Sequence, residues 1–363
     1  MRIRSSTRMR AAIIVNEFPF GGAERQAILY AQELSRRGFS VSILALKNKE
    51  SMDIGCVNIQ GLGLRKSRAT NLLGKILSNL KIYGKLRNEL KGRYDVVISF
   101  AQLYGIALCG KSLAKVLSLR IFHPESINFS RGIFLKRIDL VTCNSLPQYS
   151  LMNAKGCRAM LINNIVSVSK DYQGAALSTG GQFILVSNIS QRKNIEMAVN
   201  AFILLENKSI HLKIIGRTSE KSYSAELMKM IDNANNVEYL GFLDSGELES
   251  VYYQSEGLIH PSRREGTSNA ILDAMRYRIP AIVSRIPENI ALVENVRDFL
   301  FDPDSPEELA ERVTRLHSNL LADPHFYDEY LDLQEKKIKL VYSQDSIEEL
   351  VTAIEELVKR KNL

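Results

Sequence analysis

Short apolar runs alternate with helical segments along almost the entire chain, and this alternation restricts the possible fold more than any other feature. Each run has about the length of one β-strand. The first series lies at 11–16, 40–46, 95–100, 118–123 and 139–144, and the second at 183–188, 211–216, 237–241, 257–262 and 281–284. Strands that alternate with helices are typical of parallel sheets, so the sequence predicts an α/β fold.

Two such series indicate two domains, each with a doubly wound sheet. The 363 residues are enough for two domains of ordinary size. A short connection near 166–181 separates the series, so we expect one domain in 1–165 and the other in 166–342. Ligands of such sheets bind outside the carboxyl ends of the strands, and functional residues are therefore expected in the turns there.

Composition excludes several classes of protein. With 45% hydrophobic and 24% charged residues, the chain is typical of a soluble globular protein rather than a disordered or fibrous one. No apolar stretch approaches the ~20 residues that span a membrane, and the apolar part of the basic N-terminus, AAIIV, is too short for a signal peptide. The 4 cysteines lack metal-type or redox spacing, which favours buried thiols and predicts a cytoplasmic protein.

The net charge of +8 conceals a strong asymmetry. Residues 1–165 hold 26 Lys/Arg against 9 Asp/Glu, a balance of +17, and the remaining 22 and 31 give 166–363 a balance of −9. The densest basic stretch, 65–93, holds nine Lys/Arg and one acid, with apolar residues at helical spacing. This basic amphipathic helix predicts binding to an anionic membrane surface. A solvated helix face is the alternative, and nucleic acid is not expected because no recognised motif or aromatic stacking platform accompanies the charge.

The segment EGTSN at 265–269 leads into a helix expected at 268–277. Three residues that favour the start of a helix follow one another there: Thr267, Ser268 and Asn269. Such an N-terminus, preceded by Gly266, presents N–H donors and the positive end of the helix dipole, which attract phosphate. Glu265 and Asp273 are eight positions apart, so on a helix they would lie on roughly one side. An ordinary capped helix with two solvated acids is the alternative.

Other strand ends also carry residues suited to a ligand. Gly21 and Gly22 follow the first run and allow a turn in which a ligand approaches the main chain, although the dinucleotide fingerprint GxGxxG is absent. Arg192 and Lys193 follow the run at 183–188, just ahead of a helix whose N-terminus would bind the same phosphate. The alternative for the two glycines is a purely structural turn, and the alternative for Arg192 and Lys193 is a solvated turn with ordinary charges.

His123 ends the run at 118–123 and is followed by a proline. An imidazole at the carboxyl end of a strand is well placed for function, although a structural role is the alternative. The four other histidines have less favourable positions: His211, His260, His317 and His325.

In combination these segments resemble the retaining glycosyltransferases of GT-B fold in family four, the group 1 glycosyltransferases. The resemblance covers nearly the whole chain, through GGAERQAILYAQELSRRGFSVSILAL, RKNIEMAVNAF and LGFLDSGELESVYYQSEGLIHPSRREGTSNAILDAM, with RDFLFDPDSPEELAERV after them. Glu265 and Asp273 fall on the family's paired-acid motif, Glu-x7-Glu. The resemblance implies two Rossmann-like domains with an interdomain cleft, an N-terminal acceptor domain, a C-terminal nucleotide-sugar domain, and a helix at 343–363 that crosses back to the first domain.

The resemblance also implies roles for the matching residues. Gly22 would approach the donor diphosphate through its main chain, and His123 would lie beside the reacting sugar. Lys193 would hold the diphosphate, Glu265 would orient the donor sugar, and Asp273 would bind the ribose hydroxyls. The backbone N–H groups of 266–269 would face the same donor: Gly266, Thr267, Ser268 and Asn269.

Two positions depart from the family pattern. Asn188 stands where relatives usually have an Arg that pairs with Lys193, and Arg192 is expected to compensate from the same turn. Arg278 stands where a Gly is usual.

The implied activity is transfer of a sugar from a nucleotide-sugar to a glycan or lipid-linked acceptor, with retention, in polysaccharide or lipopolysaccharide synthesis at the inner membrane face. Cations and N–H dipoles stabilise a leaving diphosphate, so no metal or other cofactor is expected. A nucleotide-sugar epimerase of the same fold and a catalytically silent, membrane-associated partner of another transferase are the alternatives. Turnover of a nucleotide-sugar without an acceptor would favour the epimerase. Donor binding without turnover would favour the catalytically silent partner.

Overall fold

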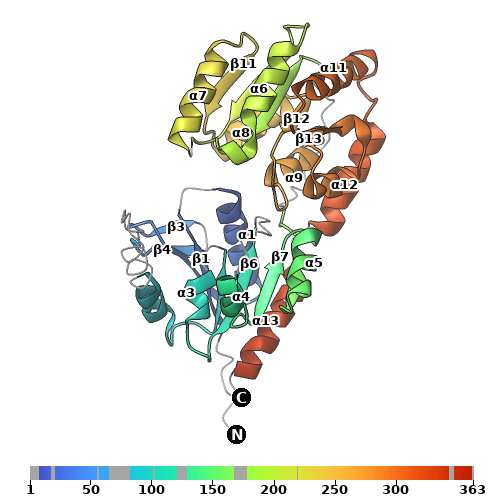
Figure 1. The fold of residues 1–363 in the computed structure, drawn as a ribbon. Helices are drawn as coiled ribbons and strands as arrows, with labels where there is room; N and C mark the ends of the chain where they lie inside the picture. Colours follow the sequence, from blue (N-terminus) through green and yellow to red (C-terminus); the bar gives the residue numbers. More distant parts are fainter. Residues whose placement is uncertain are drawn as a thin grey trace. The chain divides into compact units, whose positions relative to one another are not determined.

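The computed structural model describes residues 8–17, 21–54, 57–64, 82–100, 103–120, 129–166, 178–218, 220–342 and 347–361. The chain forms two compact units (Figure 1). Unit 1 comprises Met1–Ile165 with Gln344–Leu363, and unit 2 comprises Val166–Ser343. Each unit contains one largely parallel sheet with helices, so the predicted two-domain α/β architecture is confirmed.

The sheet of unit 1 has eight strands in the order β3-β4-β2-β1-β5-β6-β7-β8. The strands are β1 (Arg10–Val15), β2 (Ser40–Ala45), β3 (Met52–Ile54), β4 (Val57–Gly61), β5 (Val96–Ser99), β6 (Ala114–Leu119), β7 (Leu140–Cys143) and β8 (Ala159–Leu161). All neighbours are parallel except β3 and β4. The chain winds from β1 toward one edge and from β5 toward the other, which places the switch point between β1 and β5.

Helices cover both faces of this sheet, which explains why β1 is apolar along nearly its whole length. The helices of unit 1 are α1 (Gly22–Arg36), a helix at 82–90, α3 (Leu103–Ala107), α4 (Phe129–Leu135), α5 (Leu146–Ala154) and α13 (Glu348–Lys361). Buried side chains of α1 and α13 pack on one face, whereas those of the 82–90 helix, α3, α4 and α5 pack on the other.

Unit 2 has a six-stranded parallel sheet in the order β11-β10-β9-β12-β13-β14. The strands are β9 (Gln182–Val186), β10 (His211–Ile215), β11 (Val237–Gly241), β12 (Gly257–His260), β13 (Ala281–Ser284) and β14 (Leu300–Phe301). The chain runs from β9 to β10 and β11 on one side and returns to β12 on the other. The switch point of this sheet therefore lies between β9 and β12.

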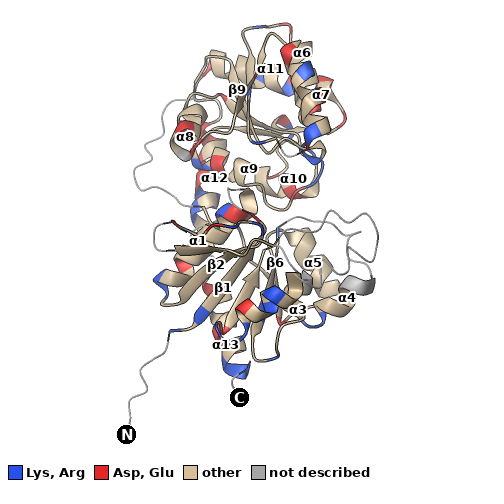
Figure 2. Cartoon of the chain, turned by 90° about the vertical axis from the view of Figure 1, so that its left-hand side faces the viewer, with Lys and Arg blue, Asp and Glu red and all other residues tan. Residues whose placement is uncertain are grey.

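Seven α-helices of unit 2 lie in the described residues: α6 (Ile195–Leu204), α7 (Lys221–Asp232), α8 (Ser245–Tyr253), α9 (Asn269–Arg276), α10 (Pro287–Val293), α11 (Pro306–Ala322) and α12 (Asp328–Val341). Side chains of α6, α7 and α11 pack on one face of the sheet, and those of α8, α9 and α10 on the other. In both units the charged residues lie mainly on helices and loops, and the strands are largely uncharged (Figure 2). Within the described ranges, no helix combines the length and apolarity needed to cross a bilayer.

Two predicted elements have different bounds in the structure. The strand expected at 118–123 is β6, which begins at Ala114 and ends at Leu119; it pairs with β5 and β7, and its Ala114 and Val116 are fully buried. The helix expected across 65–93 is described only from 82, and it ends at residue 90, where Gly92 then has a φ of 70°.

The cysteines of the described residues are free thiols. Cys109 and Cys143 are buried, and Cys157 is half-buried. Burial raises the pKa of Cys143 to about 12, so this thiol is inert near neutral pH.

Candidate functional site

Two neighbouring strand ends of unit 2 carry the residues of the candidate site. Lys193 follows β9, in a short 3-10 turn at Gln191–Lys193, and Glu265 follows β12. Because β9 and β12 flank the switch point of the sheet, the two side chains meet where doubly wound sheets bind ligands.

The Glu265 carboxylate is the centre of a buried ionic cluster. Its Oε1 lies 2.5 Å from Nζ of Lys193 and 3.2 Å from Nε2 of His260, and its Oε2 lies 3.4 Å from a guanidinium nitrogen of Arg192. Only 8% of the Glu265 side chain is exposed, against 14% for Lys193, 30% for Arg192 and 2% for His260. Three groups able to carry positive charge therefore surround one carboxylate.

These contacts determine how the cluster is charged. Burial alone would raise the pKa of Glu265, but Lys193, then His260 and Arg192, outweigh it and hold that pKa well below its ordinary value. Burial lowers the pKa of His260 below its ordinary 6.5, although Glu265 opposes this. The cluster therefore contains an ionised carboxylate and a neutral imidazole near neutral pH.

A second carboxyl group lies near the cluster. Glu288, near the start of α10, is 7% exposed. Burial raises its pKa, and the charge of Glu265 raises it further. Glu288 is consequently easier to protonate than an ordinary glutamate, and Glu265 is harder to protonate.

Hydrogen bonds to backbone carbonyls connect the two loops that carry the cluster. The N–H of Arg263 donates to the carbonyl of Arg192 at 3.0 Å. The Arg192 guanidinium donates to the carbonyl of Arg264 at 2.7 Å. Asn194, buried in the left-handed region with a φ of 55°, donates to the carbonyls of Pro261 at 3.3 Å and Pro303 at 2.8 Å.

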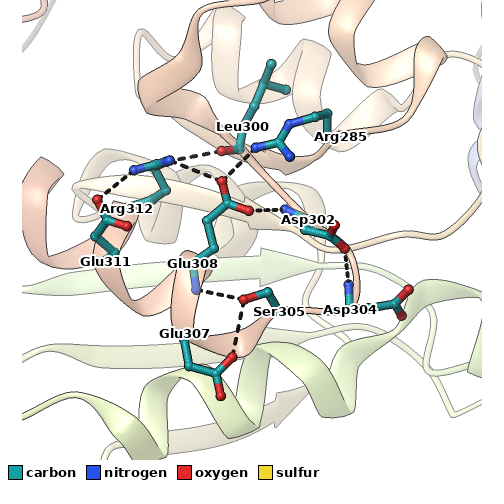
Figure 3. Close-up of polar contacts among 9 residues, drawn as sticks. All are labelled: Arg285, Leu300, Asp302, Asp304, Ser305, Glu307, Glu308, Glu311 and Arg312. Atoms are coloured by element: carbon teal, nitrogen blue, oxygen red, sulfur yellow. Dashed lines mark hydrogen bonds and ion pairs between the residues drawn. The ribbon is translucent and has the colours of Figure 1, made fainter.

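A third loop, after β14, supports the first two through Glu308 of α11 (Figure 3). The Glu308 carboxylate accepts the N–H of Asp302 at 2.7 Å and is paired with Arg285 at 2.6 Å and Arg312 at 3.1 Å. The same loop contains Pro303, which binds Asn194. Hydrogen bonds therefore connect the two loops that carry the ionic cluster to each other, and Asn194 connects them to the loop after β14.

The helix that follows Glu265 begins as expected, but its cap differs from the prediction. Ser268 is the N-cap residue of α9, with an extended backbone, and its side chain makes no capping hydrogen bond. Glu265 lies in the loop before α9 rather than on it, so the expectation that it shares one side of a helix with Asp273 was wrong. Asp273 lies within α9 and is 6% exposed, close to the burial of Glu265.

The helix after Lys193 does not offer a free N-terminus. The hydroxyl of Tyr223 accepts the N–H of Ile195 at 3.1 Å and that of Glu196 at 3.5 Å, and it donates to the Glu196 carboxylate. Tyr223 thus already accepts two N–H groups of the first turn of α6, and the binding of a phosphate there stays a prediction.

Of the predicted residues of unit 2, the structure joins Arg192, Lys193 and Glu265 in one cluster. Asn188 is exposed, and the contacts of the ionic cluster do not include it. Gly266 is buried and lies directly after Glu265, ahead of α9. Sequence reasoning placed His260 behind His123, whereas the structure places His260 against Glu265; its position at the end of β12, five residues before Glu265, was the available signal.

Two predicted residues belong to unit 1. Gly22 is exposed as the first residue of α1, which follows β1 at the switch point of that sheet. Gly21, its N-cap, has φ −102° and ψ −176°, a conformation open to any residue, so the backbone angles do not explain the glycine there. His123 lies outside the described residues.

Comparisons with known proteins identify glycosyltransferases that are similar to this chain. Residues 180–319 match the family described as Glycosyl transferases group 1. An O-antigen biosynthesis glycosyltransferase of Escherichia coli, WclY, is 29% identical over 135 residues, which are 37% of each chain. The match thus spans well under half of WclY. An uncharacterized glycosyltransferase of Haemophilus influenzae is 23% identical over 93% of this chain and 96% of its own.

The fold also resembles solved structures. A TarM variant of S. aureus superposes with a TM-score of 0.78 at 12% identity, covering 95% of this chain and 99% of that one. The group 1 glycosyltransferase match contains both Lys193 and Glu265, and the likeness of fold extends over both units. Unit 2 therefore contains a group 1 glycosyltransferase domain at 180–319, and the chain has the GT-B fold.

Proposed function

We propose that the chain transfers a sugar from a nucleotide-sugar donor to a glycan or lipid-linked acceptor during synthesis of a cell-surface polysaccharide or lipopolysaccharide. Binding of the nucleotide-sugar donor is supported by one observation, the buried cluster around Glu265 at the switch point of unit 2. Two comparisons support the substrate class: WclY is named for O-antigen biosynthesis, and the TarM variant was solved in complex with UDP.

In this proposal unit 2 binds the donor. Lys193 and Arg192 hold the diphosphate, aided by N–H groups at 266–269 ahead of α9, and Asp273 binds the ribose. Negative charge builds on the diphosphate as it leaves, and cations already in place stabilise that charge without reorganisation. The same cations perform the task that a metal ion has in other phosphate sites, and Glu265 orients the donor sugar.

Unit 1 binds the acceptor in this proposal. Gly22 lies at its switch point, and we assign His123 to the neighbourhood of the reacting sugar. The resemblance to the retaining glycosyltransferases implies a retaining transfer, in which the acceptor attacks the face that the diphosphate leaves. The basic residues within 65–93 support attachment of the protein to the anionic inner face of a membrane.

Donor binding tests the proposal directly. UDP-, GDP- and ADP-sugars are compared for thermal stabilisation, because a ligand at 100 times its Kd adds about 2.7 kcal/mol. With the donor so identified, Lys193→Ala should weaken binding by roughly 1.5–3 kcal/mol, or about 10- to 150-fold, because one charge-assisted contact to phosphate is lost.

Lys208→Ala is the matched control. Lys208 lies in the same unit, and its ammonium donates to the carbonyl of Ile203 at the exposed end of α6. The control should bind donor as the wild type does. Equal affinity of Lys193→Ala and the wild type, measured by calorimetry, would reject the donor site.

A further inference from the structure

His260 is in an unusual situation within the ionic cluster. It ends β12, is 1% exposed, and its Nε2 lies 3.2 Å from Oε1 of Glu265. The contact nevertheless lacks hydrogen-bond geometry, and Nε2 is buried without a hydrogen-bonded partner in the described part of the chain. A buried ring nitrogen left in this way costs free energy unless some state of the protein provides its partner.

Lys193 is the group closest to the same carboxylate oxygen, since its ammonium lies 2.5 Å from Oε1. A donor diphosphate would attract this ammonium, and a shift of Lys193 toward phosphate oxygens would loosen its contact with Glu265. The Glu265 carboxylate, only 8% exposed, would then be a buried anion without its closest cation.

We propose that His260 is a positioning residue that holds the Glu265 carboxylate when Lys193 turns to the diphosphate of the donor. His260 is fixed by the strand that carries it, so a small shift of the carboxylate away from Lys193 suffices to form the bond from Nε2–H to Oε1. Glu265 thus keeps its orientation toward the donor sugar throughout turnover. This inference rests on the proposed function and adds a residue to which none of the comparisons assigns a role.

The charged groups around His260 allow a pH-dependent readout. Lys193 and Arg192 face Glu265 from the loop after β9, and burial and then the charge of Glu265 raise the pKa of Glu288 on α10. In the donor complex, loss of the His260 hydrogen bond removes a group that favours ionised Glu265. The acid limb of the pH–rate profile should therefore move to higher pH by on the order of one unit.

The test compares His260→Phe, which keeps a ring of similar size, with His260→Gln, whose amide can donate to Oε1. His260→Phe should lower kcat by about 10- to 100-fold and leave the donor KM within about threefold, because the diphosphate contacts remain. His260→Gln should recover most of kcat and return the acid limb toward that of the wild type.

His317→Phe is the control for a purely structural effect. His317 is a similarly buried histidine of unit 2, and it pairs with Glu256 instead. Its replacement should lower stability without moving the acid limb. If His260→Phe has wild-type kcat and pH profile, or if His260→Gln is as impaired as His260→Phe, the inference is wrong while the donor site stands. A wild-type protein that binds no nucleoside diphosphate and turns over no nucleotide-sugar would overturn both.

Discussion

Arg278 shows how one residue combines an unfavourable backbone with favourable side-chain contacts. It follows α9 with a φ of 52°, in the left-handed region where glycine has no steric penalty. The family resemblance led us to expect glycine here, and the angle gives the physical reason. The arginine compensates through α12, since its guanidinium lies 2.6 Å from Asp332 and 2.9 Å from Glu335.

Substitution of Arg278 should separate these two effects. Arg278→Ala loses both ion pairs and keeps the strain, so it should destabilise unit 2 by about 1–2 kcal/mol. Arg278→Gly loses the same pairs but relieves roughly 1 kcal/mol of strain, and it should stay within about 1 kcal/mol of the wild type. Urea unfolding measures the difference, and equal stability of the two variants would contradict this account.

The sequence predicted individual site residues better than it predicted their contacts. Lys193, Arg192 and Glu265 were predicted as one ligand site, and the structure joins them in one cluster. His260 was undervalued because burial against Glu265 depends on the pairing of β9 with β12, which no local pattern reveals. Tyr223 was missed because it caps α6 from another helix, far away in the sequence.

The 82–90 helix has a different surface from the one that its amphipathic sequence pattern predicted. Its apolar residues Ile82, Leu86 and Leu90 are 7%, 0% and 1% exposed, because they pack into the core of unit 1. Its exposed face carries Lys85 and Arg87 instead. The described part of the predicted amphipathic helix therefore has no apolar face to insert into a bilayer, and membrane contact through it would be electrostatic.

Removal of these charges should weaken binding to anionic liposomes. Each Lys or Arg near such a surface contributes about 1 kcal/mol. Arg87→Gln on the helix, combined with Lys91→Gln at the exposed residue that follows it, should therefore lower the binding constant by about 30-fold. Lys221→Gln with Lys229→Gln on α7 makes the same change of charge in unit 2 and should have little effect. Sedimentation at two salt concentrations measures this, because screening should mimic the first variant. Equal binding of both variants would speak against the role of this helix.

Element type was more predictable than element boundaries. The run that forms β6 contains Lys115, whose charge interrupts the apolar pattern although the residue is only 5% exposed in the structure. This explains why the strand was expected several residues too late. The edge strands β3 and β14 have 3 and 2 residues, too few for any periodicity to be recognised.

At the scale of the whole molecule, the chain passes from unit 1 to unit 2 and back. Ile165 is the last residue of unit 1 before the chain enters unit 2. The Gln26 side chain donates to the carbonyl of Ile165 at 2.9 Å and accepts its N–H at 2.7 Å. The next residue, Val166, belongs to unit 2 and donates to the carbonyl of Tyr342 at 2.8 Å. The second pass ends in α13, which returns to the core of unit 1.

Truncation before α13 should unfold unit 1 selectively. Four large buried side chains of α13 would be lost: Leu350, Ile354, Leu357 and Val358. At about 1.5–3 kcal/mol each, this loss of roughly 6–12 kcal/mol is comparable with the stability of an entire domain. Hydrogen exchange should show protection retained in unit 2 and lost in unit 1. Glu349→Gln with Lys359→Gln, on the exposed face of α13, should preserve both, and protection of unit 1 after truncation would refute the prediction.

The return of α13 also affects the order in which a nascent chain can fold. Synthesis proceeds from the N-terminus at about 5–20 residues per second, so the strands of unit 1 leave the ribosome on the order of ten seconds or more before its last helix. All of unit 2 is made in that interval. The half of the protein that is started first is thus the half that is completed last. Until then, the part of its sheet face on which α13 packs beside α1 is an uncovered apolar surface, available to a chaperone.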